Sequence, residues 1–307
     1  MVSSPSFLPG SAEPRWATPS TPGRSHLAGK VEFTASALGF NGLMGHQRRI
    51  IATSTERFGD GRPAFRQVVI EEPRQQGKSV SVLSLIVTRA LERPDTMISY
   101  SAQTRNAGRR RMLDVWWPRI RRSRGLRKII EPRRALGAEA FLFANGSMIM
   151  LASGTETSDH GDTLDLAVID EAWAQRDDSI EQAVKPAMMT RDDAQLWVVS
   201  TAGTEFSAYF RGKVDDGRAM AELGVTDTAA YFGYSAPDDA DPADPATWYG
   251  CMPALGVTVS EETVRADFTT MDLAEFRRAY LCQWPEVAKP GWEVISQQAW
   301  AAAAADG

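Results

Sequence analysis

An apolar run that leads through a polar loop into a helical pattern constrains this chain more than any other feature. Residues 66–73, RQVVIEEP, form a short β-rich run closed by proline, which predicts a buried strand. Residues 77–93, which begin Gly-Lys-Ser, carry an apolar face at helical spacing. A loop between a strand and a helix can point successive backbone N–H groups at phosphate oxygens. The pattern therefore predicts an α/β fold with a phosphate-binding loop, or P-loop.

The end of this loop has the residue types that nucleotide phosphates require. Gly77 permits a close approach, Lys78 brings positive charge to the β and γ phosphates, and Ser79 offers a hydroxyl to Mg²⁺. The Arg74 guanidinium could contact the γ phosphate. Glu72 stands where such loops usually begin with glycine, so an ordinary helix start is the alternative. The predicted loop comprises Pro73, Arg74, Gln75, Gln76, Gly77, Lys78 and Ser79.

Strands and helices alternate after this loop. Further strands are predicted at residues 95–102, 163–172 and 194–203, and residues 140–152 are typical of a hairpin that turns at its Asn-Gly pair. This alternation predicts a P-loop NTPase with a mostly parallel central sheet and helices on both faces.

Composition divides the chain into four parts. Residues 1–28 are rich in Pro, Ser and Thr, which predicts a disordered or loosely attached arm. Residues 29–204 hold the predicted nucleotide-binding core. Residues 205–290 are loop-rich, acidic and proline-rich around a strong amphipathic helix, which predicts a small lid subdomain. Residues 291–307 are typical of a linker.

Two carboxylates end the apolar run LDLAVIDE, residues 164–171. Asp170 could hold the Mg²⁺ shell and Glu171 could polarise the water that attacks ATP. The alternative is a pair of acidic residues at the start of a helix. Ligands of parallel sheets bind at the carboxyl ends of strands, where both this pair and Lys78 are expected. The two motifs together favour an ATP-hydrolysing site.

Two further motifs are weaker. Ser200, Thr201, Ala202 and Gly203 end the next apolar run and could sense the γ phosphate, although a tight turn needs the same residue types. Gln47 lies in a predicted helix over residues 40–58, and its amide could bind the edge of adenine. An exposed helical glutamine is the alternative.

Charge is distributed unevenly along the chain. The net charge is −5, yet Arg105 to Arg134 contains eleven arginines and Lys128 against Asp114 and Glu131. A segment so strongly of one sign favours contact with a polyanion, and a solvated helical face is the alternative. No run of about 18 apolar residues exists, so no membrane span is predicted.

The set RQQGKS, LDLAVIDEA and STAG, with an upstream glutamine, resembles the ATPase domain of phage large terminases. These motors package DNA into viral capsids, and the resemblance runs from about Leu43 to the end of the sequence. It implies Lys78, Ser79, Asp170 and Glu171 as the hydrolytic set, Arg74 as an in-loop arginine, Gln47 at adenine and Ser200 to Gly203 as a coupling motif.

The resemblance also implies a reaction and partners. ATP with Mg²⁺ would be hydrolysed to ADP and phosphate to drive double-stranded DNA into a capsid. The subunits would form a homo-oligomeric ring, a pentamer, around the DNA, with the portal protein and the small terminase as partners. The protein would act in the host cytoplasm, with no membrane partner.

Two departures from the family pattern matter. The stretch before the acidic strand, SGTETSDHGDTLD, contains His160 but no arginine to reach a neighbouring subunit's site. That arginine is then Arg133 or Arg134, or activation between subunits differs. The family's nuclease domain would begin where this sequence stops, so nuclease activity is not expected from this chain alone.

Two other functions fit part of the pattern. A helicase, or another nucleic-acid-dependent ATPase, could use the same sheet, but a helicase of this type needs a second, similar domain. The residues after Gly203 are too few and too rich in loops for that domain. A nucleotide-gated capsid assembly protein is the second alternative, and Glu171 argues against it because binding alone needs no base.

Overall fold

The computed structural model describes residues 8–152, 163–226 and 228–285. Its strands are β1 (Trp16–Ala17), β2 (Gln67–Glu71), β3 (Met97–Ser101), β4 (Ile130–Arg133), β5 (Ala140–Phe143), β6 (Met148–Leu151), β7 (Leu166–Asp170), β8 (Gln195–Ser200) and β9 (Ala229–Gly233). Its longer helices are α1 (Ala28–Ala37), α2 (Gly45–Ser54), α3 (Lys78–Glu92), α6 (Ser179–Met188), α7 (Ala208–Leu223), α9 (Glu261–Thr270) and α10 (Leu273–Leu281). The shorter helical segments are α4 (Arg105–Arg110), the π-helix η1 (Arg111–Trp116), α5 (Trp117–Arg122), η2 (Leu126–Lys128), η3 (Ala172–Ala174) and α8 (Pro245–Cys251). None of the helices in these ranges has the length and apolarity needed to cross a membrane.

The strands form one nine-stranded sheet in the order β1-β9-β2-β8-β7-β3-β6-β5-β4. The six strands from β9 to β6 run parallel, and β1, β5 and β4 add antiparallel edges. Strand β8 lies between β2 and β7 and pairs with both, with Glu71 opposite Ser200 and Val199 opposite Asp170. The ends of these three strands therefore meet at one edge of the sheet.

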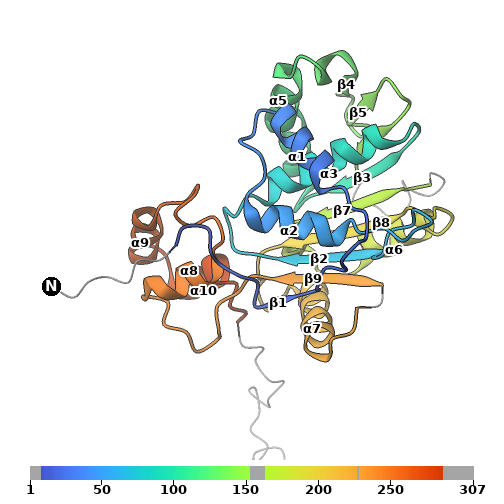
Figure 1. The fold of residues 1–307 in the computed structure, drawn as a ribbon. Coiled ribbons are helices and arrows are strands. Elements are labelled where there is room, and N and C mark those ends of the chain that lie inside the picture. Colours follow the sequence, from blue (N-terminus) through green and yellow to red (C-terminus); the bar gives the residue numbers. More distant parts are fainter. Residues whose placement is uncertain (1–7, 153–162, 227, 286–307) are drawn as a thin grey trace, which may run out of the picture.

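Helices cover both faces of the sheet (Figure 1), which confirms the predicted fold class. One hydrophobic core joins α1, α2 and α3 to one face, and a second joins α6 and α7 to the other. Strands β7 and β8 are buried along their whole length. Strands covered on both faces are continuous apolar runs, and the runs at 164–171 and 194–200 have this pattern.

A small lid packs at one end of the sheet (Figure 1). Helices α8, α9 and α10 share their own core, which includes Trp248 and Phe276. The lid begins later than residue 205, because α7 packs on the sheet and β9 pairs with β2. The short run that forms β9 lies in a segment that looks loop-rich in sequence, and its strand conformation depends on its partners in the sheet.

The first 28 residues are not a loose arm where the structure describes them. Strand β1 pairs with β9, and the Thr18 hydroxyl oxygen accepts from the Tyr231 amide at 2.9 Å. Arg49 pairs with Glu13. A chain can add to a sheet edge through backbone hydrogen bonds without any apolar periodicity, so composition misled the prediction. Residues 1–7 and the predicted linker at 291–307 lie outside the described residues.

Candidate functional site

The predicted P-loop joins β2 to α3 at the sheet edge where β7 and β8 also end. Gly77 caps α3 with φ of +87°, a left-handed conformation that glycine adopts without strain. A Cβ atom at this position would lie 2.4 Å from Gln47 Nε2 and 2.8 Å from Met44 Cε. The loop therefore requires glycine here for both its conformation and its packing.

Lys78 lies at the centre of this loop. Its ammonium donates to the carbonyl oxygens of Glu72 at 2.9 Å and Pro73 at 2.6 Å, so it is held by the loop's own backbone. Ser79 and Gln75 are exposed to solvent on either side of it. The loop thus surrounds a buried positive charge, which is the charge that an anionic ligand needs.

Helix α2 supports the loop from behind. Gln47 Nε2 donates to the Gly77 carbonyl at 2.9 Å, and its Oε1 accepts from the Met44 amide at 2.8 Å. His46 Nε2 donates to the Gln76 carbonyl at 3.0 Å. Both ends of the Gln47 amide are therefore engaged by the protein, and contact with adenine stays a prediction for this residue.

A buried pair of titratable groups lies under the head of the loop. His46 Nε2 is 3.6 Å from a Glu72 carboxylate oxygen that has no hydrogen-bond partner among the described residues. Burial raises the pKa of Glu72 to about 7, although Lys78 opposes the shift. Burial also lowers the pKa of His46 to about 4, against its hydrogen bond to Gln76. Glu72 thus fits the loop head partly because the site favours its neutral form.

The two groups should affect stability with opposite pH dependence. Between pH 4.5 and about 7 the folded state keeps a proton on Glu72 that the unfolded state loses. The contribution of Glu72 to the free energy of unfolding therefore falls as pH rises. Between pH 4 and 6.5 the folded state keeps His46 neutral, whereas the unfolded state protonates it. The contribution of His46 to the free energy of unfolding therefore rises with pH. Glu72→Gln should therefore gain stability relative to the wild type, by roughly 3 kcal/mol, as pH rises from 4.5 to 7.

Urea unfolding of the two proteins across this range measures the difference. His46→Gln is the paired variant, and its stability relative to the wild type should fall with rising pH. Parallel curves for all three proteins would contradict the assignment of buried neutral forms.

The acidic pair follows β7. Asp170 Oδ2 accepts from the Tyr100 hydroxyl at 2.9 Å and from Arg111 Nη1, and Oδ1 accepts from the Glu171 amide at 3.0 Å. Burial raises the pKa of Asp170, and Arg111 opposes the shift. No sequence motif pointed to Arg111, which begins the π-helix η1. Such helices are rare and occur often at functional sites.

Glu171 has a left-handed backbone with φ of +55°, which is uncommon for residues other than glycine. Its Oε2 accepts from the Trp173 indole at 3.0 Å. Glu171 is only partly buried, unlike Asp170, so it can meet water at the surface of the site.

The predicted coupling motif lies where the sheet meets the lid. Ser200 Oγ accepts from the Trp173 amide at 3.0 Å, and the Ala202 carbonyl accepts from Arg278 Nη1 at 2.7 Å. The Thr201 hydroxyl lies 3.4 Å from the sulfur of Cys282. A Cβ atom on Gly203 would lie 2.2 Å from Ser207 Oγ, so a larger residue does not fit.

The lid also contacts the P-loop directly. The Arg74 amide donates to the Ala279 carbonyl at 2.8 Å, and its guanidinium pairs with Glu275 at 3.1 Å. Gln76 Oε1 accepts from the Ala254 amide at 2.7 Å. The structure thus places Arg74 against the lid, and its predicted contact with the γ phosphate would require it to change partner.

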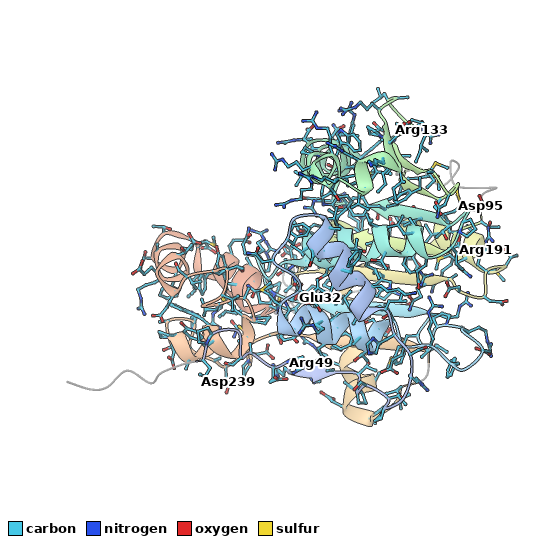
Figure 2. All side chains as sticks on the ribbon, turned by 45° about the horizontal axis from the view of Figure 1, so that its top comes forward. Glu32, Arg49, Asp95, Arg133, Arg191 and Asp239 are labelled. Carbon is cyan, nitrogen blue, oxygen red and sulfur yellow. The ribbon has the colours of Figure 1, made fainter. Side chains whose placement is uncertain are left out.

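The arginine-rich segment has two sets of cations. Arg105 and Arg109 pair with the buried Glu139, and Arg111 pairs with Asp170, so these three fasten the segment to the core. Figure 2 shows many nitrogen-tipped side chains around the part of the molecule that carries Arg133, away from the lid. Within this segment, the exposed cations with no ion pair among the described residues are Arg110, Arg121, Arg122, Arg124, Arg127, Lys128 and Arg134.

Arg133 and Arg134 are the two residues predicted to reach a neighbouring subunit's site, and they differ in their contacts. Most of the SGTETSDHGDTLD stretch, with His160, lies outside the described residues. Arg133 donates to the Ala138 carbonyl at 2.6 Å, whereas Arg134 is exposed.

Comparisons with known proteins identify a family for this chain and solved structures with a similar fold. A family described as terminase large subunit, T4likevirus-type, N-terminal, matches residues 69–293. The crystal structure of the bacteriophage HK97 large terminase is similar with a TM-score of 0.70 at 18% identity, over 85% of this chain and 56% of that one. The large terminase ATPase domain of Thermus phage P74-26 is similar with a TM-score of 0.54 at 19% identity, over 81% and 96% of the chains. No curated protein sequence matches.

Proposed function

This chain belongs to the family of phage terminase large subunits, and we propose that it is the ATPase domain of a DNA-packaging motor. The chain spans 56% of the length of the HK97 protein, so the activity proposed here is that of this part alone. We further propose that it works as a homo-oligomeric ring around double-stranded DNA, with a portal protein and a small terminase as partners, in the host cytoplasm.

One observation carries the proposal of ATP hydrolysis. The P-loop, with the buried Lys78 ammonium, follows β2, and the acidic pair Asp170-Glu171 lies at the end of β7. Because β8 pairs with both strands, the two motifs lie at the same edge of the sheet. A phosphate held at Lys78 would therefore lie beside a carboxylate for a metal ion and a second carboxylate for water. A site that only bound a nucleotide would need no water-accessible carboxylate at the half-buried Glu171.

The residues present fit a magnesium ion. Mg²⁺ prefers oxygen ligands, and keeps several waters alongside one or two carboxylates and the substrate phosphates. The Asp170 carboxylate and the exposed Ser79 hydroxyl offer such oxygens, and the Arg111 contact shows that Asp170 already holds a positive partner. When bound, the ion would neutralise charge on the phosphates.

The chain's own groups account for the remaining chemistry. Lys78 would leave the carbonyls of Glu72 and Pro73 to bind the β and γ phosphate oxygens. Glu171 would accept a proton from a water whose oxygen bonds to the γ phosphorus. The bond between that phosphorus and the β-phosphate oxygen breaks, and the products are ADP and phosphate.

Steady-state ATP hydrolysis, with and without double-stranded DNA, tests the proposed function. We expect turnover that DNA stimulates. Nucleotide binding without turnover at any protein or DNA concentration would favour a nucleotide-gated assembly protein. A protein that binds no nucleotide would contradict the site itself.

The exposed cations of the arginine-rich segment are the proposed DNA surface. Removal of Arg121 and Arg122 by substitution with serine should weaken DNA binding at all sequences and reduce the slope of log affinity against log salt by about two. Arg62→Ser with Arg265→Ser is the control of equal charge, because both residues are exposed and lie outside this segment. Equal slopes for the two double variants would place the DNA elsewhere.

A further inference from the structure

We propose that Trp173 is a positioning residue for Glu171 and that Arg278 of the lid helix α10 fixes Trp173 in that role. The inference rests on the proposed ATPase function and adds to it a physical path between the lid and the catalytic carboxylate. Neither residue belongs to the motifs that identify the site in the sequence.

Trp173 is anchored by its backbone, and its indole reaches Glu171. Its amide donates to Ser200 Oγ at 3.0 Å and its carbonyl accepts from Ser207 Oγ at 2.6 Å. The indole Nε1 donates to Glu171 Oε2 at 3.0 Å. This bond engages one carboxylate oxygen, while the other accepts no hydrogen bond from the described residues. The geometry thus leaves one oxygen available to accept a proton from water.

Arg278 holds the other side of the indole. Its guanidinium carbon lies 4.9 Å from the centre of the Trp173 ring, where a cation is attracted to the ring face. Its Nη1 donates to the Ala202 carbonyl at 2.7 Å, and its Nε and Nη2 donate to Glu275 at 2.8 and 2.7 Å. The side chain is only 8% exposed. A buried charge with these partners cannot move alone without a large loss of hydrogen bonding.

Glu275 extends the path to the P-loop, because it also pairs with Arg74. The backbone of Arg74 donates to Ala279 of the same lid helix. A nucleotide that draws Arg74 away would leave Glu275 to Arg278 alone, and so would alter the contact that fixes Trp173. The position of the lid is therefore coupled to the orientation of Glu171 through the side chains of Glu275, Arg278 and Trp173.

Trp173→Phe is the decisive variant, because it keeps an aromatic ring under Arg278 and removes the indole N–H that reaches Glu171. We expect kcat to fall about ten-fold or more, since a hydrogen bond to a charged group is lost. KM for ATP and the affinity for nucleotide should stay within about two-fold, because the lost bond orients the base and does not bind substrate.

Arg278→Lys keeps the charge and removes the planar group, and should lower kcat in the same way. Arg277→Lys is the matched control on the neighbouring position of the helix, where the arginine donates to Gln283 and not to the site. The double variant Trp173→Phe with Arg278→Lys should be no slower than the slower single variant, because both changes break one path.

Hydrogen exchange adds a measurement that does not need turnover. Exchange at the Trp173 amide should be faster in Arg278→Lys than in the wild type, and unchanged in Arg277→Lys. Wild-type kcat in Trp173→Phe, multiplied effects in the double variant, or unchanged exchange in Arg278→Lys would each overturn the proposed path. A wild-type protein that never hydrolyses ATP would instead contradict the proposed function, and this role with it.

Discussion

Replacement of Glu171 with glutamine is expected to lower kcat for ATP hydrolysis by about 10²- to 10⁴-fold, with nucleotide binding retained. Glutamine has the shape of glutamate and can still accept from the Trp173 indole, which donates to Glu171 Oε2 at 3.0 Å. It cannot take a proton from water. Steady-state turnover and nucleotide titration on the same preparation separate the two effects.

Glu205→Gln is the matched control for this variant. Glu205 is an exposed glutamate that follows the coupling motif at the same edge of the sheet, so its substitution removes a similar charge nearby. Its activity should equal that of the wild type. An active Glu171→Gln protein would mean that another group accepts the proton, and the assignment of the base would be wrong.

Substitution of Asp193 with alanine is expected to lower the free energy of unfolding by about 3–5 kcal/mol. The single carboxylate of Asp193 pairs with three arginines, which are Arg57 at 2.5 Å, Arg89 at 3.0 Å and Arg93 at 2.7 Å. Arg89 is 2% exposed, and burial lowers its pKa, so the loss of its carboxylate leaves a charge that water cannot reach. This cluster ties the end of α3 to the start of β8, at the sheet edge opposite the P-loop.

Urea unfolding of Asp193→Ala against Asp192→Ala measures this effect with the local sequence held constant. Asp192 is exposed beside the buried residue, so its removal should change stability by no more than about 0.5 kcal/mol. Similar midpoints for the two variants would show that the three arginines find other partners and that Asp193 is not the centre of the cluster.

The parts of the site that consist of neighbouring residues could be predicted from their motifs. The structure places the Gly-Lys-Ser loop between a strand and a helix, as its motif predicted. It also places the acidic pair at the end of the strand predicted there. The prediction failed for β1 and β9, whose few residues become strands only because partners in the sheet satisfy their backbone groups. The nucleotide contacts expected of Gln47 and Arg74 stay predictions, and the structure adds their contacts with the loop and the lid.

What the sequence by itself determined is the α/β fold, the P-loop and the family, because strand and helix periodicity and motif spacing are properties of neighbouring residues. Only the tertiary structure decided that β8 separates the two motif strands, that Arg111 pairs with Asp170, and that Arg278 contacts Trp173. These partners are far apart along the chain, and no local pattern indicates which charges meet. Strand order and helix packing decide that, because a buried charge is stable only where the fold supplies its partner.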